Sequence, residues 1–488
     1  MLKFVRNPGR PNPARVTRRG FFSRISDGVH GAALAALLCD DLGAAKTASH
    51  PAAPADLRTR PPHFEPRAKS VIHLFMNGGP SQIDLFDHKP ELKKYEGKQG
   101  PRDILSKIEF ADEIGGILPS PFEFGRHGEC GMEVSELLPH FAGVVDDVTL
   151  IRSMWGESFN HEPSLYLMHS GRTLPGRPSL GSWVVYGLGS ENQNLPGYVV
   201  LDDPKRLPVN GIQNWQSGWL PPVFQGTRVR SEGPPVLNLH PGEELASPLV
   251  EAERDLLRSL NRTHLEGRPW QPELQARIAS YELAARMQLA APDALDISQE
   301  TEVTKEMYGL DRKETASYGT RCLMARRLVE RGVRFVQIFI EYQIWDNHSD
   351  LQKNLRYSCE KTDQPIAALI TDLKRRGLLD DTLVVWGGEF GRMPLSQVGR
   401  EGSAGRDHGP DGFSMWMAGG GVKRGHVHGA TDEIGHKAVE GRVSVQDFHA
   451  TLLHLLGLDF QRLTFERHGL EERLTDQYPA GVVTDILA

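Results

Sequence analysis

Acidic and imidazole side chains stand beside apolar runs at three places in the second half of this 488-residue chain. The motifs are GGEFGR, WDNH and GRDHGP, and the side chains are Glu389, Asp346, His348 and His408. Carboxylate and imidazole are ligand types that suit zinc, manganese or iron, and such mixed sites activate a bound water or a substrate oxygen. Together the three motifs predict a divalent-metal site, with the ion open among zinc, manganese and calcium.

The segments around Glu389 predict a parallel α/β sheet. Residues 382–386 form a continuous apolar run, typical of a strand covered on both faces, and residues 365–377 before it predict an amphipathic helix. Glycines on both sides of Glu389 let the backbone bend at the carboxyl end of the strand, where open parallel sheets bind ligands. We therefore expect an α/β fold with a doubly wound, mostly parallel sheet and helices on both faces.

Further apolar runs predict strands at 71–76, 333–340 and 413–418. The first of these opens the domain at about Ser70 and ends in the loop NGGPSQID, which suits a central position in the sheet. Asp84 and Asp87 follow this strand and are further candidate metal ligands, Asp84 being the one included in the predicted site.

The composition restricts the class of protein. Hydrophobic residues make up 39% and charged residues 24%, as in an ordinary globular protein, and the net charge of -7 argues against binding to nucleic acid. No apolar run of about 18 residues is present, so no transmembrane helix is expected in the mature protein. The four cysteines lack metal-ligand or redox spacing, and disulfides are not expected to organise the fold.

The first 26 residues are basic and contain no acidic side chain. Arg18 and Arg19 lie in TRRGFF, which resembles a twin-arginine export signal, and residues 29–38 form a short, weak apolar segment. We expect residues 1–50 to be a signal peptide that engages the twin-arginine export machinery and delivers the protein to the periplasm or the extracellular space. The alternative is a basic tail with a chance arginine pair.

The rest of the chain is predicted as a Pro/Ala/Arg-rich linker, 51–69, and one domain, 70–488. Within the domain, residues 233–320 differ in character, because charged, Ala/Leu/Arg-rich segments at 244–260 and 272–289 predict an inserted helical layer over one sheet face. Residues 443–458 predict a helix that closes the core. Its two histidines, His449 and His454, are not assigned to the site.

The collinear motifs resemble the DUF1501 family of exported bacterial proteins, within the alkaline phosphatase and sulfatase superfamily. They are GGPSQIDLFDHKPEL, WDNH, GGEFGR, GRDHGP, MAGGGVKRGHVHGATDEIG and VSVQDFHATLLHLLGLD, and the likeness spans about residues 70–458. The resemblance implies that Glu389 takes the place of a metal-binding Asp and that His408 is similar to the last metal-binding His. Phe390 stands where the next ligand is expected and cannot coordinate a cation.

The same resemblance leaves two points open. Asp346 and His348 resemble the Asp and His of a second metal, but their spacing of two in place of four leaves open whether one or both bind. HEPSLYLMHSGR resembles the sulfatase motif with His161 in place of the cysteine that becomes formylglycine. His161 is therefore expected to be a nucleophile or a metal ligand, and Arg172 to orient the anion.

These expectations predict an exported, metal-dependent hydrolase of phosphate or sulfate esters, with an anionic small molecule or glycan ester as substrate. The alternative is a non-catalytic exported binding protein that keeps the pocket for an anionic glycan or a partner. In that case the His161 turn keeps only its helix-capping role.

Overall fold

The computed structural model describes residues 56–100, 114–236, 247–268, 272–397 and 403–488. These described residues form one compact unit. The predicted signal peptide, 1–50, lies outside the described residues. The predicted linker is described from Asp56 onward, and its backbone bonds to the domain, for example from Arg60 to Leu188 and from His63 to Gly457. This part of the predicted linker is therefore packed on the domain.

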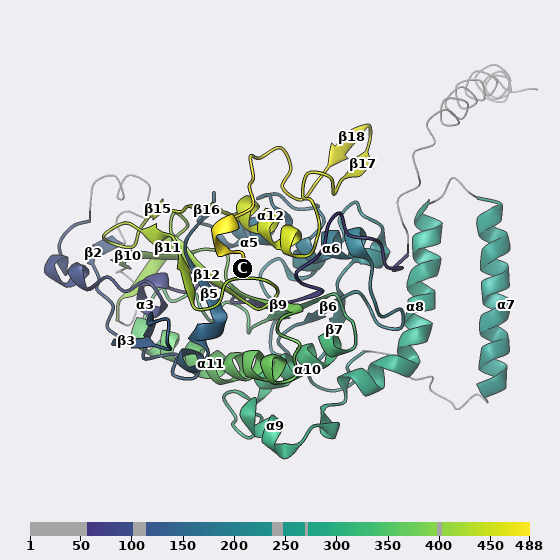
Figure 1. Cartoon of the computed structure of the whole chain (residues 1–488), viewed down its shortest axis with the longest axis horizontal. Helices are drawn as coiled ribbons and strands as arrows, with labels where there is room; N and C mark the ends of the chain where they lie inside the picture. The colour runs from purple at the N-terminus through teal and green to yellow at the C-terminus, as the bar shows by residue number, and fades with distance from the viewer. Residues whose placement is uncertain (1–55, 101–113, 237–246, 269–271, 398–402) are drawn as a thin grey trace, which may run out of the picture. The chain divides into compact units, whose positions relative to one another are not determined.

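The core of the unit is a nine-stranded sheet with the order β13-β5-β12-β9-β1-β8-β6-β7, and β16 also pairs with β5 (Figure 1). The strands are β1 (Ser70–Phe75), β5 (Val148–Trp155), β6 (Tyr198–Leu201), β7 (Thr227–Val229), β8 (Phe335–Phe339), β9 (Thr382–Gly387), β12 (Phe413–Ala418), β13 (His426–His428) and β16 (Val443–Ser444). From β7 to β9 all neighbours are parallel, and β12 runs antiparallel to β9 and β5.

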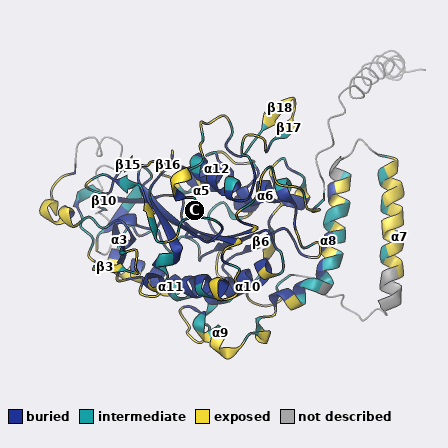
Figure 2. Ribbon diagram, in the orientation of Figure 1, coloured by how far each residue is buried: buried dark blue, intermediate teal, exposed yellow. Residues whose placement is uncertain are grey.

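Helices cover both faces of this sheet. On one side lie α10 (Ala316–Glu330) and α11 (Leu351–Arg375), and on the other α5 (His161–Ser170), α6 (Leu180–Leu188) and α12 (Val445–Leu455) (Figure 1). Every residue of β1, β8 and β9 is buried, which explains their continuous apolar runs (Figure 2). The predicted fold class and the central position of β1 are confirmed.

The helix before β9 is longer than the sequence predicted. The structure starts α11 at Leu351 and places Pro365 inside the helix. A proline inside a helix removes one backbone hydrogen bond, so a helix that continues through Pro365 needs other support. Leu355, Cys359 and Ile366 are buried at helical spacing on both sides of Pro365, so core packing carries the helix through it.

A second, three-stranded sheet has the order β11-β10-β2 and consists of β2 (Ile114–Ile117), β10 (Gly391–Gln397) and β11 (Gly405–Gly409). The sequence places the polar motif GRDHGP before the predicted strand 413–418, and the structure shows that Gly405–Gly409 is itself a strand that pairs antiparallel with β10. Its polar sequence shows no apolar alternation, so only the pairing identifies it as a strand. Smaller two-stranded ladders are β3 (Phe124–His127) with β4 (Met132–Ser135), β14 (Ala430–Thr431) with β15 (Ala438–Glu440), and β17 (Phe465–Arg467) with β18 (Leu470–Glu472).

The predicted helical insertion contains α7 (Ser247–Glu266), α8 (Pro272–Leu295) and α9 (Glu302–Met307). Helix α8 packs against α10 and the 3-10 turn η7 (Pro222–Phe224), whereas α7 packs on α8. Helix α7 is largely exposed (Figure 2), and Leu256, Leu257 and Leu260 are among its exposed residues. Among the described residues, no helix is both long and apolar enough to span a bilayer.

Candidate metal centre

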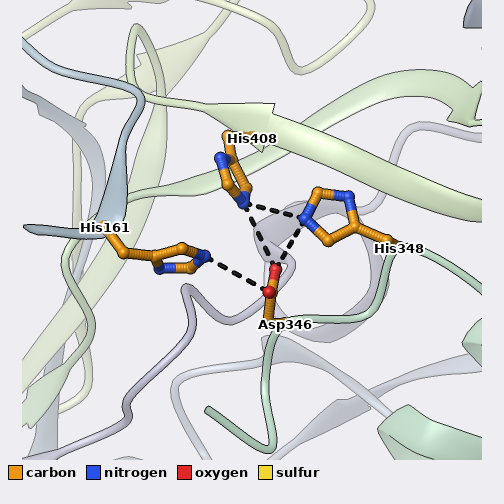
Figure 3. Close-up of side chains that lie close together, drawn as sticks. All are labelled: His161, Asp346, His348 and His408. Carbon is orange, nitrogen blue, oxygen red and sulfur yellow. Dashed lines mark hydrogen bonds and ion pairs between the residues drawn. The ribbon is translucent and has the colours of Figure 1, made fainter. Parts of the chain in front are cut away.

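Four side chains from distant parts of the sequence converge at the carboxyl edge of the sheet (Figure 3). Asp346 and His348 lie in the loop after β8, His408 lies on β11, and His161 is the first residue of α5. One ligand atom from each of the four side chains lies within 4.8 Å of all the others. The structure therefore brings together both members of the Asp346 and His348 pair with His408 and His161.

The separations match those of ligands around one small cation. His348 Nε2 lies 2.9 Å and His408 Nε2 lies 3.2 Å from Asp346 Oδ1. His161 Nε2 lies 3.3 Å from Asp346 Oδ2, and the Nε2 atoms of His348 and His408 are 3.0 Å apart. Four ligands at about 2.0 Å around a tetrahedral zinc ion are roughly 3.3 Å from one another. A cation at the centre would thus require only small movements.

A buried nitrogen without a hydrogen bond also fits a metal ion. His161 Nε2 is buried and has no partner with hydrogen-bond geometry, although it faces Asp346. Buried polar atoms without a hydrogen bond are uncommon in protein interiors, and a bound metal ion would give this nitrogen a partner. Three imidazole nitrogens and one carboxylate form a donor set for zinc, manganese or iron, whereas calcium prefers oxygen ligands alone.

Further residues orient two of the candidate ligands, His161 and His348, from behind. Glu389 Oε1 lies 2.7 Å from His161 Nδ1, and the backbone N–H of Gly78 donates to the same carboxylate over 2.9 Å. Gln397 Oε1 bonds to Nδ1 of His348. Because Nδ1 is held in His161 and in His348, the Nε2 atoms of these two rings are left to face the centre of the cluster. This carboxylate–histidine arrangement is the usual way in which proteins fix the tautomer of a metal-binding His.

Arg392 connects the loops that carry these residues. Its guanidinium donates to Asp346 Oδ1 over 2.7 Å and to the carbonyls of Gly79 and Arg406 over 2.9 and 3.1 Å. Only 1% of the Arg392 side chain is exposed. A buried guanidinium with several carbonyl acceptors and one carboxylate is well satisfied, so Arg392 fixes the position of Asp346.

The charges of the cluster shift three pKa values. Burial would raise the pKa of Asp346, but the charge of Arg392 and the three histidines that surround its carboxylate outweigh this effect and hold the pKa well below its usual range. Burial lowers the pKa of His161, yet the neighbouring carboxylates of Asp346 and Glu389 outweigh this effect and raise it to about 9. Burial, together with the charges of Arg392 and His161, lowers the pKa of His408 to about 3. In the metal-free protein a proton on His161 thus supplies positive charge between the carboxylates.

Two glycines after β1 permit the close approach of the loops. Gly78 has φ +110°, and a Cβ there would lie 2.6 Å from the backbone nitrogen of Asp346. Gly79 has φ +78°, and its Cβ would lie 2.5 Å from the ring of Phe390. That ring packs against His408 and His161 with centroid distances of 4.5 and 5.0 Å. Phe390, which stands where a ligand was expected, therefore lines one side of the site.

Three other predicted residues lie outside the cluster. Asp84 is fully buried in an ion pair with Arg406 at 2.7 Å, which satisfies its carboxylate. Asp87, the second acidic residue of that loop, pairs with Lys89 at 3.1 Å. Arg172 follows the end of the ten-residue helix α5, about 15 Å from its start at His161. It pairs with Asp476 at 2.7 Å, so the structure does not bring it to the metal centre.

The sequence predicted Glu389 as a metal ligand and did not predict the contacts that Arg392 and Gln397 make with Asp346 and His348. Glu389 lies one layer behind the cluster, because its carboxylate bonds to His161 rather than facing the other ligands. Arg392 stands in the GGEFGR motif and was a detectable signal, since a charged residue next to a predicted buried strand end needs partners. No comparable signal marks Gln397, at the end of the second-sheet strand β10.

Solved structures with detectable likeness include a sulfatase, PsFucS1, from Pseudoalteromonas sp., with 12% identity over 80% of this chain and 68% of that chain and a TM-score of 0.34. A phosphonate monoester hydrolase from Silicibacter pomeroyi has 11% identity over 80% and 73% of the two chains and a TM-score of 0.32. An alkaline phosphatase superfamily protein from Vibrio parahaemolyticus has 9% identity over 84% and 71%, also with 0.32. Likeness at this level implies no shared activity or substrate.

No curated protein sequence matches the chain significantly. A family model described as "Protein of unknown function (DUF1501)" matches residues 68–487, nearly the whole of the folded unit. The chain belongs to the DUF1501 family.

Proposed function

We propose that this protein is an exported, metal-dependent hydrolase of phosphate or sulfate esters. The observation that carries the proposal is the convergence of His161, Asp346, His348 and His408, in which the buried Nε2 of His161 has no hydrogen-bond partner. The cluster lies beyond the carboxyl ends of β8 and β9, where open α/β sheets bind ligands.

His161, Asp346, His348 and His408 would hold the metal ion. When bound, the ion would polarise the ester and lower the pKa of a water molecule so that it can attack at neutral pH. Of the three ions that the sequence left open, zinc and manganese suit three imidazoles and one carboxylate better than calcium does.

The start of α5 supports an anionic substrate. His161 is the first residue of this ten-residue helix, so the partial positive charge of the helix N-terminus lies beside the cluster. Free backbone N–H groups at such a terminus bind phosphate or sulfate oxygens. The helix would thus orient the anionic ester group, the role that the sequence had given to Arg172.

We assign His161 the role of metal ligand rather than nucleophile. Its Nδ1 is bonded to Glu389, and its Nε2 points toward Asp346 and the other two histidines. A nucleophilic imidazole needs one nitrogen free to face the ester, and neither nitrogen meets that need. Water is then the attacking group, and no covalent intermediate on the protein is expected.

Metal analysis and an ester panel test the proposal. The purified full-length mature protein should contain about one zinc or manganese ion per chain and hydrolyse at least one aryl phosphate or sulfate. His348→Ala and His408→Ala should each lose the ion and the activity. His264→Ala, which changes an exposed histidine of α7, is the matched control and should keep both. Stoichiometric metal without turnover of any ester would refute hydrolysis and favour a binding protein.

A further inference from the structure

A cationic side chain without an acidic partner lies on the same sheet edge as the metal centre. Arg206 is exposed and stacks on the ring of Tyr342, with its guanidinium carbon 3.7 Å from the ring centroid. We propose that this Arg206–Tyr342 pair binds a second anionic group of the substrate, so that the preferred ester carries at least two negative groups. This inference rests on the proposed function.

The topology places the pair at the edge that carries the site. Arg206 lies in the loop after β6, and Tyr342 lies in the loop after β8. These strands are parallel neighbours, so both loops leave the sheet at its carboxyl edge. Tyr342 precedes the candidate ligand Asp346 by four residues, a span of at most about 14 Å.

A second connection brings Arg206 near the other side of the cluster. Asn210, four residues after Arg206, donates from Nδ2 to the carbonyl of Glu162 over 2.9 Å. Glu162 is the neighbour of His161 in the first turn of α5. The loop that carries Arg206 is thus fixed to the helix that carries one candidate ligand, while Tyr342 belongs to the loop that carries another.

Three carboxylates on the loops of Arg206 and Tyr342 are occupied by other cations. Asp202 pairs with Arg228 at 2.6 Å, and Asp203 pairs with Arg321 at 2.7 Å. Glu341, next to Tyr342, accepts from Lys205 and Lys361 at 3.1 and 2.6 Å. Within the described ranges, Arg206 alone of these cations has no carboxylate within ion-pair distance.

The chemistry of the pair suits an anion. Stacking on an aromatic ring restricts a guanidinium and leaves its N–H groups at the edge of the plane free to donate. These donors bind carboxylate, sulfate or phosphate with two parallel hydrogen bonds. The backbone of Tyr342 has φ +34°, uncommon for a residue with a side chain, which indicates that the loop holds the ring in a defined position.

A binding experiment with the full-length mature protein tests the pair. The probe is a heparin-derived tetrasaccharide, which carries several anionic groups along its length, and inorganic sulfate is the single-anion comparison. Isothermal titration calorimetry would be run on zinc-loaded and on metal-free protein. Arg206→Gln should weaken tetrasaccharide binding about tenfold, the effect of one charge-assisted contact, and leave sulfate binding unchanged.

Two more variants separate the stacked geometry from bulk charge. Arg206→Lys keeps the charge but loses the planar fork, and should recover only part of the affinity. Arg424→Gln removes another exposed charge, which pairs with Asp380, just before β9 and therefore at the amino edge of the sheet. It should bind the tetrasaccharide as the wild type does.

The outcomes also distinguish this inference from the proposed function. Wild-type affinity in Arg206→Gln, equal losses in Arg206→Gln and Arg424→Gln, or a wild type that does not bind the tetrasaccharide would each overturn the anion subsite. If the Arg206 effect appears but the protein takes up no metal, the subsite stands and the hydrolase proposal fails. If the protein hydrolyses esters in a metal-dependent way but Arg206→Gln binds the tetrasaccharide as the wild type does, the hydrolase proposal stands and the subsite fails.

Discussion

Glu389 and His161 are 228 residues apart in the sequence, yet the carboxylate of Glu389 lies 2.7 Å from Nδ1 of His161. The contact joins the loop after β9 to the first residue of α5. It turns Nε2 of His161 toward Asp346, His348 and His408 (Figure 3). Glu389, which the sequence predicted as a metal ligand, thus orients His161 in the structure.

Glu389→Gln should weaken metal binding 10- to 100-fold, the usual cost of losing a partner that orients a metal-binding His. The amide keeps the size of the side chain but removes the negative charge that raises the pKa of His161. Competition with a fluorescent chelator would measure the affinity, and circular dichroism would check the fold. An unchanged affinity would show that Glu389 does not orient a ligand.

Metal should stabilise the folded protein, because the four ligands converge only in the native state. At a free metal concentration 100 times Kd, the free energy of unfolding should rise by about 2.7 kcal/mol, and EDTA should reverse the change. Thermal unfolding with zinc or manganese measures it. His408→Ala should abolish the metal-dependent increase, whereas His264→Ala should retain it. A stabilisation that persists in His408→Ala would place the ion elsewhere.

Arg392→Met should destabilise the metal-free protein by about 3 to 5 kcal/mol, since it leaves the carboxylate of Asp346 and several carbonyls without their buried donor. The exposed pair between Arg424 and Asp380 provides the control, and Arg424→Met should cost about 0 to 1 kcal/mol. Urea denaturation measures both variants. Equal costs for the two would show that Arg392 does not hold the loops together.

Three buried histidines behind the site should make the fold sensitive to acid. Burial lowers the pKa of His73 to about 3 and that of His449 to about 4, and it also lowers the pKa of His169. Because these folded-state pKa values lie below the ordinary 6.5, the contribution to stability is full above pH 6.5. It is lost as the pH falls, since the unfolded chain binds the protons first.

Between pH 7 and pH 5, His73 and His449 should each reduce the free energy of unfolding by about 2 kcal/mol. Urea denaturation in EDTA at both pH values tests this without interference from the metal site. His73→Phe keeps a ring among Phe75 and Phe335 but cannot bind a proton, so its loss on acidification should be smaller by about that amount. An identical loss in wild type and His73→Phe would contradict the assignment.

Export should depend on the arginine pair near the N-terminus. Replacing Arg18 and Arg19 together by Lys should retain the precursor in the cytoplasm, because twin-arginine signals require the pair. Replacing Arg10 and Arg15 by Lys changes as many residues in the same basic segment and should leave export intact. Cell fractionation followed by immunoblotting gives the result, and normal export of the first variant would refute the twin-arginine route.

The sequence alone determined the central strands and the edge at which chemistry gathers. Strands β1, β9 and β12 lie within one residue of their predicted bounds, because strands buried on both faces have continuous apolar runs. The carboxyl-edge rule then placed Asp346, His348 and Glu389 in loops that meet.

Only the tertiary structure decided what each side chain faces. The carboxylate of Glu389 bonds to His161, and that of Asp84 forms a buried ion pair with Arg406. Arg172 lies beyond the far end of the helix that begins at His161. Local periodicity fixes the face of a strand or helix on which a residue lies, but not which of several distant loops approaches it. Those approaches depend on long-range packing, in which Gly78 lets the β8 loop come close and Arg392 joins it to the neighbouring segments.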